Sequence, residues 1–302
     1  MIAVTIENST YCGYACLTCA RQKMKNANKN MPDEFFFRIV DDIKRWNEKR
    51  GAIEALSFVG MGDPLMDSGF INKARYVKEH TSLKIHLTNT AHMLKGDLID
   101  GVCEYVDSVK ISHYGVTNET YRKVHGGGQL QKVVENIEKL LDHEKRPRVT
   151  MTFLMVNENK NEMDKWIQKW QDKCDSIDVW MPHNWGGNYE SGMQIGERKS
   201  CNRPGRDFEI HVDGKVSVCC LDVCEDLIIG DLNEQSWQEI LESPSLKKII
   251  GLHEKGEYEK CGICANCDLL YDRKDALIYS SDETTKVGRK AGYSSNAVDF
   301  FD

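Results

Sequence analysis

The sequence lacks the features of an exported, membrane-spanning or nucleic-acid-binding protein. No stretch approaches the roughly 18 apolar residues that a membrane span needs, and the N-terminus has no signal-peptide pattern. The 40 basic residues are outnumbered by 47 acidic ones, so there is no excess of positive charge to neutralise a phosphate backbone. We therefore expect a cytoplasmic protein with no membrane or nucleic-acid partner.

Cysteine, in contrast, is abundant. Twelve cysteines occur among 302 residues, and without export signals their number points to metal ligation and not to a disulfide framework. Three lie near the N-terminus and seven between Cys201 and Cys267, whereas Cys103 and Cys174 stand alone and are expected to be buried small side chains. The length suits one domain of about 200 residues and a smaller one.

The three N-terminal thiols, Cys12, Cys16 and Cys19, follow a short apolar run. A structural zinc site would need a fourth Cys or His nearby, and the next candidate, His80, is distant in the sequence. Three thiolates can instead hold three irons of a four-iron cluster and leave one iron open. A zinc site or an incidental group of thiols is the alternative.

The spacing C-x3-C-x2-C resembles the cluster loop of the radical S-adenosylmethionine enzymes. The resemblance implies that the open iron chelates S-adenosylmethionine and that an electron from the cluster releases a 5'-deoxyadenosyl radical, which takes hydrogen from carbon. It also implies an electron donor such as flavodoxin or ferredoxin. Thr18 stands where a bulky apolar residue is common in the family and packs near the adenine. This departure puts the adenine contact in question but not the ligation of the cluster.

Strands and helices are expected to alternate over residues 2–181. The strands are expected at 2–6, 53–60, 83–87, 106–111, 148–156 and 176–181, and the helices at 31–49, 69–80, 94–103, 129–141 and 158–173. Such alternation predicts an α/β fold with parallel strands and helices outside. Six units match the partial (β/α)6 barrel of the radical S-adenosylmethionine family, with the helix after the sixth strand left open.

Segments at these strand ends resemble the cofactor-binding segments of the family. Residues 60–64 look like its Gly-Gly-Glu-Pro segment, with Asp63 where Glu is usual, and residues 88–90 resemble its Thr-Asn-Gly. Each alone could be an ordinary turn or cap, but all fall at predicted strand ends, where barrels hold their sites. The resemblance implies these contacts to S-adenosylmethionine: Met61, Gly62, Asp63, Asn89, Ser112, Arg122 and Asn157.

The sixth predicted strand ends in a polar and aromatic segment that contains His183 and Trp185. His183 can exchange a proton near neutral pH and is the candidate catalytic residue for contact with a substrate. Alternatively, both side chains pack the junction with the next domain.

The second group of cysteines surrounds a predicted hairpin. Asp213 and Gly214 separate two alternating runs, which indicates a hairpin that returns Cys219 to the neighbourhood of Cys201. A helical stretch at 236–253 and a C-x2-C-x2-C run follow. Hairpin thiols together with a C-x2-C can make one four-cysteine site, and a zinc ribbon is an alternative to an iron-sulfur cluster.

This arrangement resembles the SPASM and twitch domains of radical enzymes, which bind auxiliary four-iron clusters, and is most similar to the twitch form of the deoxy-scyllo-inosamine dehydrogenase type. The resemblance implies one auxiliary 4Fe-4S cluster, with a second site left open for the remaining cysteines of this region. The expected ligands of the auxiliary cluster are Cys201, Cys219, Cys264 and Cys267. Domains are expected at 1–190 (barrel) and 191–275 (a small α+β domain), followed by a partly disordered tail at 276–302.

These expectations favour an enzyme that oxidises a small polar molecule such as a sugar or aminocyclitol, because an auxiliary cluster can accept the electron that a ketyl radical must lose. Radical modification of a peptide or protein side chain is the alternative, although Cys12 leaves no room for the leader-binding domain that such enzymes often carry. A non-enzymatic zinc- or iron-binding module is the alternative from another class.

Overall fold

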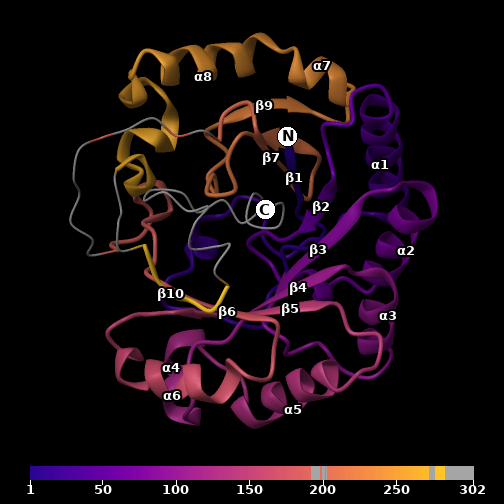
Figure 1. Cartoon of the computed structure of the whole chain (residues 1–302). Helices are drawn as coiled ribbons and strands as arrows, with labels where there is room; N and C mark the ends of the chain where they lie inside the picture. Colours follow the sequence, from indigo (N-terminus) through magenta and orange to yellow (C-terminus); the bar gives the residue numbers. More distant parts are fainter. Residues whose placement is uncertain (192–197, 199–200, 202, 272–275, 283–302) are drawn as a thin grey trace.

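The computed structural model describes residues 1–191, 198, 201, 203–271 and 276–282. Its centre is one ten-stranded sheet with the order β10-β6-β5-β4-β3-β2-β1-β7-β8-β9. Six consecutive strands are parallel and form the arc of an open barrel (Figure 1). They are β1 (Ala3–Ile6), β2 (Ala55–Phe58), β3 (Lys84–Asn89), β4 (Ser108–Ser112), β5 (Arg148–Leu154) and β6 (Ser176–Trp180).

Helices cover the outer face of this arc (Figure 1). The strand side chains that meet them are apolar: the ring of Phe58 lies 5.5 Å from that of Phe36 and 5.2 Å from that of Phe70, between centroids. Burial of this face holds the helices on the barrel. The helices are α1 (Asp33–Asn47), α2 (Phe70–His80), α3 (Asp97–Tyr105), α4 (Asn118–His125), α5 (Leu130–Leu141) and α6 (Met163–Trp170).

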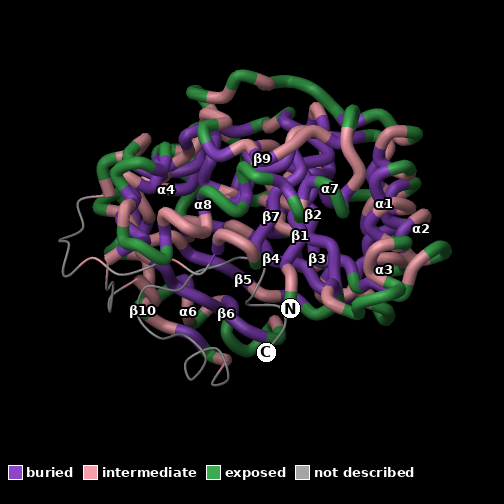
Figure 2. Tube along the Cα trace, turned by 90° about the horizontal axis from the view of Figure 1, so that it is seen from above, coloured by how far each residue is buried: buried purple, intermediate pink, exposed green. Residues whose placement is uncertain are grey.

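The inner face of the same strands is polar, because successive strand residues point to opposite faces. One row across the sheet consists of Thr5, Ser57, His86 and Ser108, each opposite the next. These side chains are buried, and Figure 2 shows the strands mainly in the colour of buried residues. Buried polar groups need partners, so the interior of the barrel is suited to a polar ligand.

The C-terminal cysteines are carried by an extension of the same sheet. β7 (Asp207–Ile210) runs parallel to β1, and β8 (Lys215–Ser217) and β9 (Ile228–Asp231) follow it in antiparallel order. The hairpin predicted at Asp213 and Gly214 is therefore confirmed. α7 (Trp237–Leu241) and α8 (Pro244–Glu254) lie over this extension (Figure 1). The expected domain boundaries stay a prediction, because the strands before and after residue 190 belong to one sheet.

Several elements differ from those expected. α4 was not predicted, and the helical stretch at 236–253 is two helices, because Ser243 caps a new helix that begins at Pro244. After β6 the described chain continues as a short 3-10 helix, η4 (Trp185–Gly187). β10 (Leu277–Ser280) pairs with the free edge of β6, which corrects the predicted tail at these residues. Residues 283–302 of that tail lie outside the described residues.

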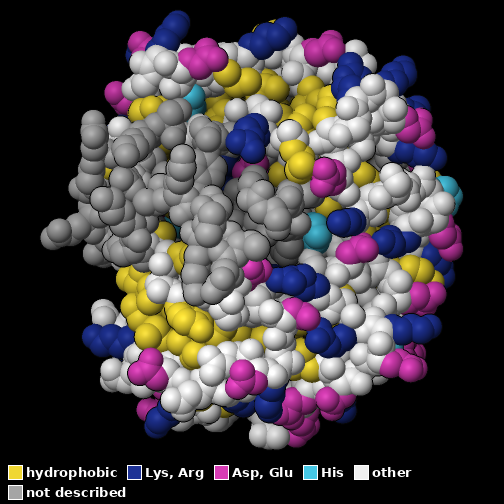
Figure 3. All heavy atoms as spheres, in the orientation of Figure 1, with side chains coloured by type: hydrophobic (Ala, Val, Ile, Leu, Met, Phe, Trp, Pro, Cys, Tyr) yellow, Lys and Arg dark blue, Asp and Glu magenta, His cyan; other side chains and the backbone are white. Residues whose placement is uncertain are grey.

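The surface shows no sign of a single dominant charge on the face drawn in Figure 3, outside the grey atoms, where Lys and Arg lie among Asp and Glu. None of the helices in the described part of the chain is long and apolar enough to cross a membrane.

Candidate active site

A cavity of about 250 Å³ lies at the carboxyl ends of the barrel strands. This end of a parallel barrel is where loops from several strands converge on a ligand. The structure brings nine of the predicted site residues to its wall: Cys12, Cys16, Cys19, Met61, Gly62, Asp63, Asn89, Ser112 and His183.

Two predicted cofactor contacts do not line this cavity. Arg122 is exposed, because α4 turns Tyr121 and Val124 toward the core. Asn157 is also exposed and accepts a hydrogen bond from Lys160 Nζ at 3.4 Å. We therefore leave Arg122 and Asn157 out of the candidate site.

The loop with the three N-terminal thiols is held by the end of α4. The N–H groups of Ala15 and Leu17 donate to the carbonyl oxygens of His125 and Val124, at 3.1 and 2.9 Å. The last carbonyls of a helix have no partner within it, so the loop satisfies them. Gly126 ends the helix at a φ of 68°, and a Cβ there would lie 2.1 Å from the Ala15 carbonyl oxygen. Only glycine fits both requirements.

His125 also reaches a predicted cluster ligand. Its Nε2 accepts the N–H of Tyr114 at 3.1 Å, so the proton of the neutral ring lies on Nδ1, which is 3.5 Å from Cys16 Sγ. Burial lowers the pKa of His125 to about 3, which keeps the ring neutral. His125 therefore orients the Cys16 sulfur. The sequence pointed to this segment but not to this residue.

The environment of the three thiols is better suited to ligands of an iron-sulfur cluster than to unligated cysteines. Burial raises the pKa of Cys12, Cys16 and Cys19, and the charge of a neighbouring thiolate adds to the rise at Cys12 and Cys16. Thiolates placed so close repel one another, and metal binding offsets that repulsion because the metal takes the deprotonated sulfur.

The loop after β2 is fixed against its neighbours. Glu7 Oε1 accepts the N–H of Met61 at 2.9 Å, and the Asp63 carboxylate accepts the hydroxyl of Thr90 at 3.0 Å. A Cβ on Gly62 would lie 2.2 Å from a carbonyl oxygen of the segment that follows β1. Asp63 thus ties the loops after β2 and β3 together at the wall of the cavity.

Another wall of the cavity comes from the end of β6 and from the C-terminal part of the chain. Arg203 Nη1 donates to Cys220 Sγ at 2.9 Å, and both residues line the cavity. Trp185 Nε1 donates to the carbonyl oxygen of Thr18 at 2.6 Å, beside the cluster loop. His183 lines the cavity next to Trp185, so this segment both contacts the cavity and packs a junction.

The cysteines predicted to hold the auxiliary cluster lie within electrostatic reach of one another. Burial raises the pKa of Cys219 and Cys267, and the nearby charge of Cys201 adds to both. The pKa of Cys264 is raised by its hydrogen bond to Cys261 and by burial, with contributions from Cys219 and Cys267. This donor set fits a cluster bound by four thiolates.

The sequence analysis missed a histidine beside these cysteines. The ligand atoms of His253 on α8, Cys261 and Cys264 all lie within 4.8 Å of one another, and the three residues are buried. The hydrogen bond with Cys264 lowers the pKa of Cys261, and the neighbouring His253 lowers it further. A histidine shortly before a C-x2-C run is the spacing signal that could have identified it.

Comparison with known families identifies the class of protein. The Radical SAM superfamily matches residues 6–169, and SPASM, an iron-sulfur cluster-binding domain, matches residues 201–268. The chain therefore belongs to the radical SAM superfamily and carries a C-terminal SPASM domain, which confirms the resemblance seen in the sequence. These domains imply 4Fe-4S clusters and S-adenosylmethionine as cofactors.

Individual relatives are distant. The structure of BtrN in complex with AdoMet and 2-DOIA is 15% identical, with a TM-score of 0.67 over 89% of this chain and 93% of that one. Streptococcus suis SuiB bound to precursor peptide SuiA is 13% identical, with a TM-score of 0.65 over 88% and 70%. A probable GTP 3',8-cyclase of Saccharolobus islandicus is 20% identical over 52% of this chain. The chain spans about half (49%) of the length of that curated relative.

Proposed function

We propose that this radical SAM protein oxidises a small polar molecule, such as a sugar or an aminocyclitol, with the auxiliary cluster as the electron acceptor. One observation carries the proposal. The same cavity is lined by the three cluster-loop thiols and by Arg203 and Cys220, which belong to the part of the chain that holds the auxiliary cysteines. A substrate in this cavity would lie between the two metal centres.

The residues of the chain divide into three groups in this proposal. Cys12, Cys16 and Cys19 hold the cluster that binds S-adenosylmethionine, and residues 61–63, Asn89 and Ser112 contact that cofactor at the strand ends. When bound, these cofactors supply a 5'-deoxyadenosyl radical that takes a hydrogen atom from carbon. The auxiliary cluster is held by Cys201, Cys219, Cys264 and Cys267.

The cavity wall supports a hydroxyl-bearing substrate. Polar side chains from successive strands face it, and they can bind hydroxyl groups as donors and acceptors. They include Thr88, Asn89, Lys110, Ser112, Thr152 and His183. Because His183 Nδ1 accepts the N–H of Trp185 at 3.2 Å, the neutral ring carries its proton on Nε2. His183 therefore serves as a hydrogen-bond donor to a substrate oxygen in this proposal.

The test uses anaerobically reconstituted protein, S-adenosylmethionine and a panel of carbon-deuterated sugars and aminocyclitols, with flavodoxin or ferredoxin as the proposed electron donor. We expect deuterium in 5'-deoxyadenosine together with a ketone product. Deuterium transfer without a ketone would mean that the protein catalyses a redox-neutral reaction and not an oxidation. No transfer from the panel, but transfer from a deuterated peptide, would favour the peptide-modifying alternative.

A further inference from the structure

A row of ionisable side chains on β7 and directly after it extends the polar interior of the barrel. Asp207, Glu209 and His211 alternate with Phe208, whose ring packs against Trp237 of α7 on the other face. β7 pairs with β1 in a register that sets Glu209 opposite the inward-facing Thr5. Glu209 therefore points to the same side of the sheet as the candidate active site.

Glu209 forms part of the wall of two further cavities. The first, of about 50 Å³, shares His183, Arg203 and Cys220 with the active-site cavity. The second is a small space lined by Glu209 together with Glu7, His211, Asp222, Lys25, Asn26 and Glu225. Lys25 is exposed and Asn26 is partly exposed. Glu209 thus lies between the substrate space and groups that reach solvent.

The Glu209 side chain is buried and incompletely paired. The residue is 3% exposed, and its Oε2 has no hydrogen-bond partner among the described residues. Buried polar atoms rarely stay without a partner. Because Glu209 lines a cavity next to the candidate active site, a substrate hydroxyl is a suitable partner.

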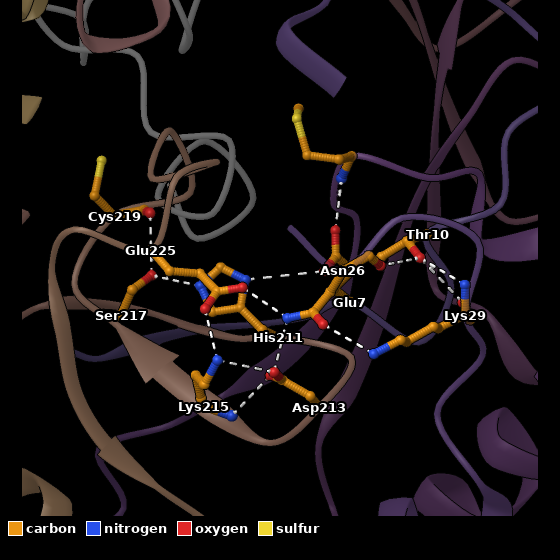
Figure 4. Close-up of polar contacts among 11 residues, drawn as sticks. Glu7, Thr10, Asn26, Lys29, His211, Asp213, Lys215, Ser217, Cys219 and Glu225 are labelled. Atoms are coloured by element: carbon orange, nitrogen blue, oxygen red, sulfur yellow. Dashed lines mark hydrogen bonds and ion pairs between the residues drawn. The ribbon is translucent and has the colours of Figure 1, made fainter. Parts of the chain in front are cut away.

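His211 gives this carboxylate a partner of opposite charge. Its Nδ1 lies 3.9 Å from Glu7 Oε2, and its Nε2 lies 3.1 Å from Ser217 Oγ. Figure 4 shows His211 between Glu7 and Ser217. Burial opposes the charge of His211, but Glu7 and Glu209 outweigh it and raise the pKa of His211 to about 9. The ring is therefore protonated near neutral pH and can stabilise an anionic Glu209.

The acid-base properties of Glu209 suit proton transfer. Burial and the charges of Glu7 and Asp222 raise its pKa to about 8, while His211 and Arg203 oppose the rise. A general base works best when its pKa lies near the working pH.

We propose that Glu209 is the base that accepts the hydroxyl proton of the substrate during oxidation. The inference rests on the proposed function. In this step the 5'-deoxyadenosyl radical that the bound cofactors would supply would take the carbinol hydrogen atom, and the hydroxyl proton passes to the Glu209 carboxylate. The auxiliary cluster, which Cys201, Cys219, Cys264 and Cys267 would hold, would accept the remaining electron as the C=O double bond forms. The proton then leaves through the small cavity between Glu209 and the surface.

The test compares wild type with Glu209→Gln and Glu209→Asp, and uses exposed Glu234→Gln as the matched control. The probes are deoxy-scyllo-inosamine, scyllo-inositol and glucose, each deuterated at its carbinol carbons. We expect Glu209→Gln to lower the kcat for ketone formation by about 10²- to 10⁴-fold. Deuterium should still enter 5'-deoxyadenosine in a single turnover, and Glu209→Asp should recover part of the rate. Iron content and a circular-dichroism melt must match those of wild type.

The pH profile gives an independent readout. The ionised form of Glu209 is the base, so wild-type ketone formation should rise as the pH passes about 8. The profile should lose this rise in Glu209→Gln. The charged or titratable groups around Glu209 are Glu7 just after β1, Asp207 on β7, His211 just after β7, and Arg203, Cys220 and Asp222 beside the cavities.

Each outcome decides between the two proposals. If wild type transfers no deuterium from any probe, the proposed function fails and the role of Glu209 fails with it. If wild type forms ketone and Glu209→Gln forms it equally fast, only the inference about Glu209 is wrong. A raised KM with an unchanged kcat would mean that Glu209 binds the substrate without accepting its proton.

Discussion

Single residues of the cluster loop depend on neighbours that are remote in the sequence. Cys16 lies beside His125, and the loop backbone donates hydrogen bonds to the end of α4. The spacing of the thiols predicts what they bind, because the motif lies within one short segment and can be recognised without knowledge of the fold. It does not predict which histidine orients a sulfur, because that contact forms only when α4 packs on the loop.

We expect the combined substitution of Cys12, Cys16 and Cys19 by alanine to abolish formation of 5'-deoxyadenosine, because three thiolates are needed to hold the cluster. The measurement is chromatographic detection of 5'-deoxyadenosine after reduction with dithionite. Cys103→Ala is the control, since Cys103 is a buried residue of α3 and not a predicted ligand. Cleavage of S-adenosylmethionine by the triple variant would contradict the assignment of this loop.

At the scale of elements, the strands of the barrel could be predicted because their outer faces are apolar and their ends carry turn signals. α4 was missed because it is short, and β10 because its pairing with the edge of β6 is set by tertiary contacts. Likewise, the alternating run before Asp213 predicts a hairpin but not the place of Glu209. Its place inside the barrel follows from the pairing of β7 with β1, which lies about 200 residues earlier in the chain.

A pair of glycine substitutions tests the packing of the loop after β2. We expect Gly62→Ala to destabilise the fold by about 1–3 kcal/mol, because the new Cβ would meet backbone, and to weaken binding of S-adenosylmethionine. Gly251→Ala should instead stabilise by about 0.5–1 kcal/mol, since Gly251 lies within α8 and no atom lies within 4 Å of an added Cβ. Denaturant unfolding and a binding titration measure both effects. Equal effects of the two substitutions would be evidence against the close contact at Gly62.

For the whole molecule, the metal content tests the division of the cysteines. Three plus four thiolates supply two four-iron clusters, so reconstituted protein should hold about eight irons per chain, and the cluster-loop triple variant about four. About twelve irons would mean that Cys220, Cys224 and Cys261 serve a third cluster. Zinc that disappears in His253→Ala would instead assign His253 and Cys261 to a separate metal ion.

The role of the auxiliary cluster can be distinguished from that of the first cluster by its effect on ketone formation. Substitution of Cys264 and Cys267 by alanine should leave some cleavage of S-adenosylmethionine, which depends on the N-terminal thiols, while the ketone disappears. Because binding of a metal often contributes to folding, a circular-dichroism melt must show that the variant is folded. Full ketone formation by a folded double variant would make the auxiliary cluster structural.

The pairing of β1 with both β2 and β7 has a consequence for synthesis of the chain. β1 is made well before β7, so one of its edges acquires its partner only when residues 207–210 have emerged from the ribosome. Until then a strand of buried residues offers open backbone groups to other nascent chains. We therefore expect a fragment of residues 1–190, expressed alone, to aggregate or to be retained by chaperones, whereas the full chain reaches a monodisperse state. Size-exclusion chromatography of the two would show the difference.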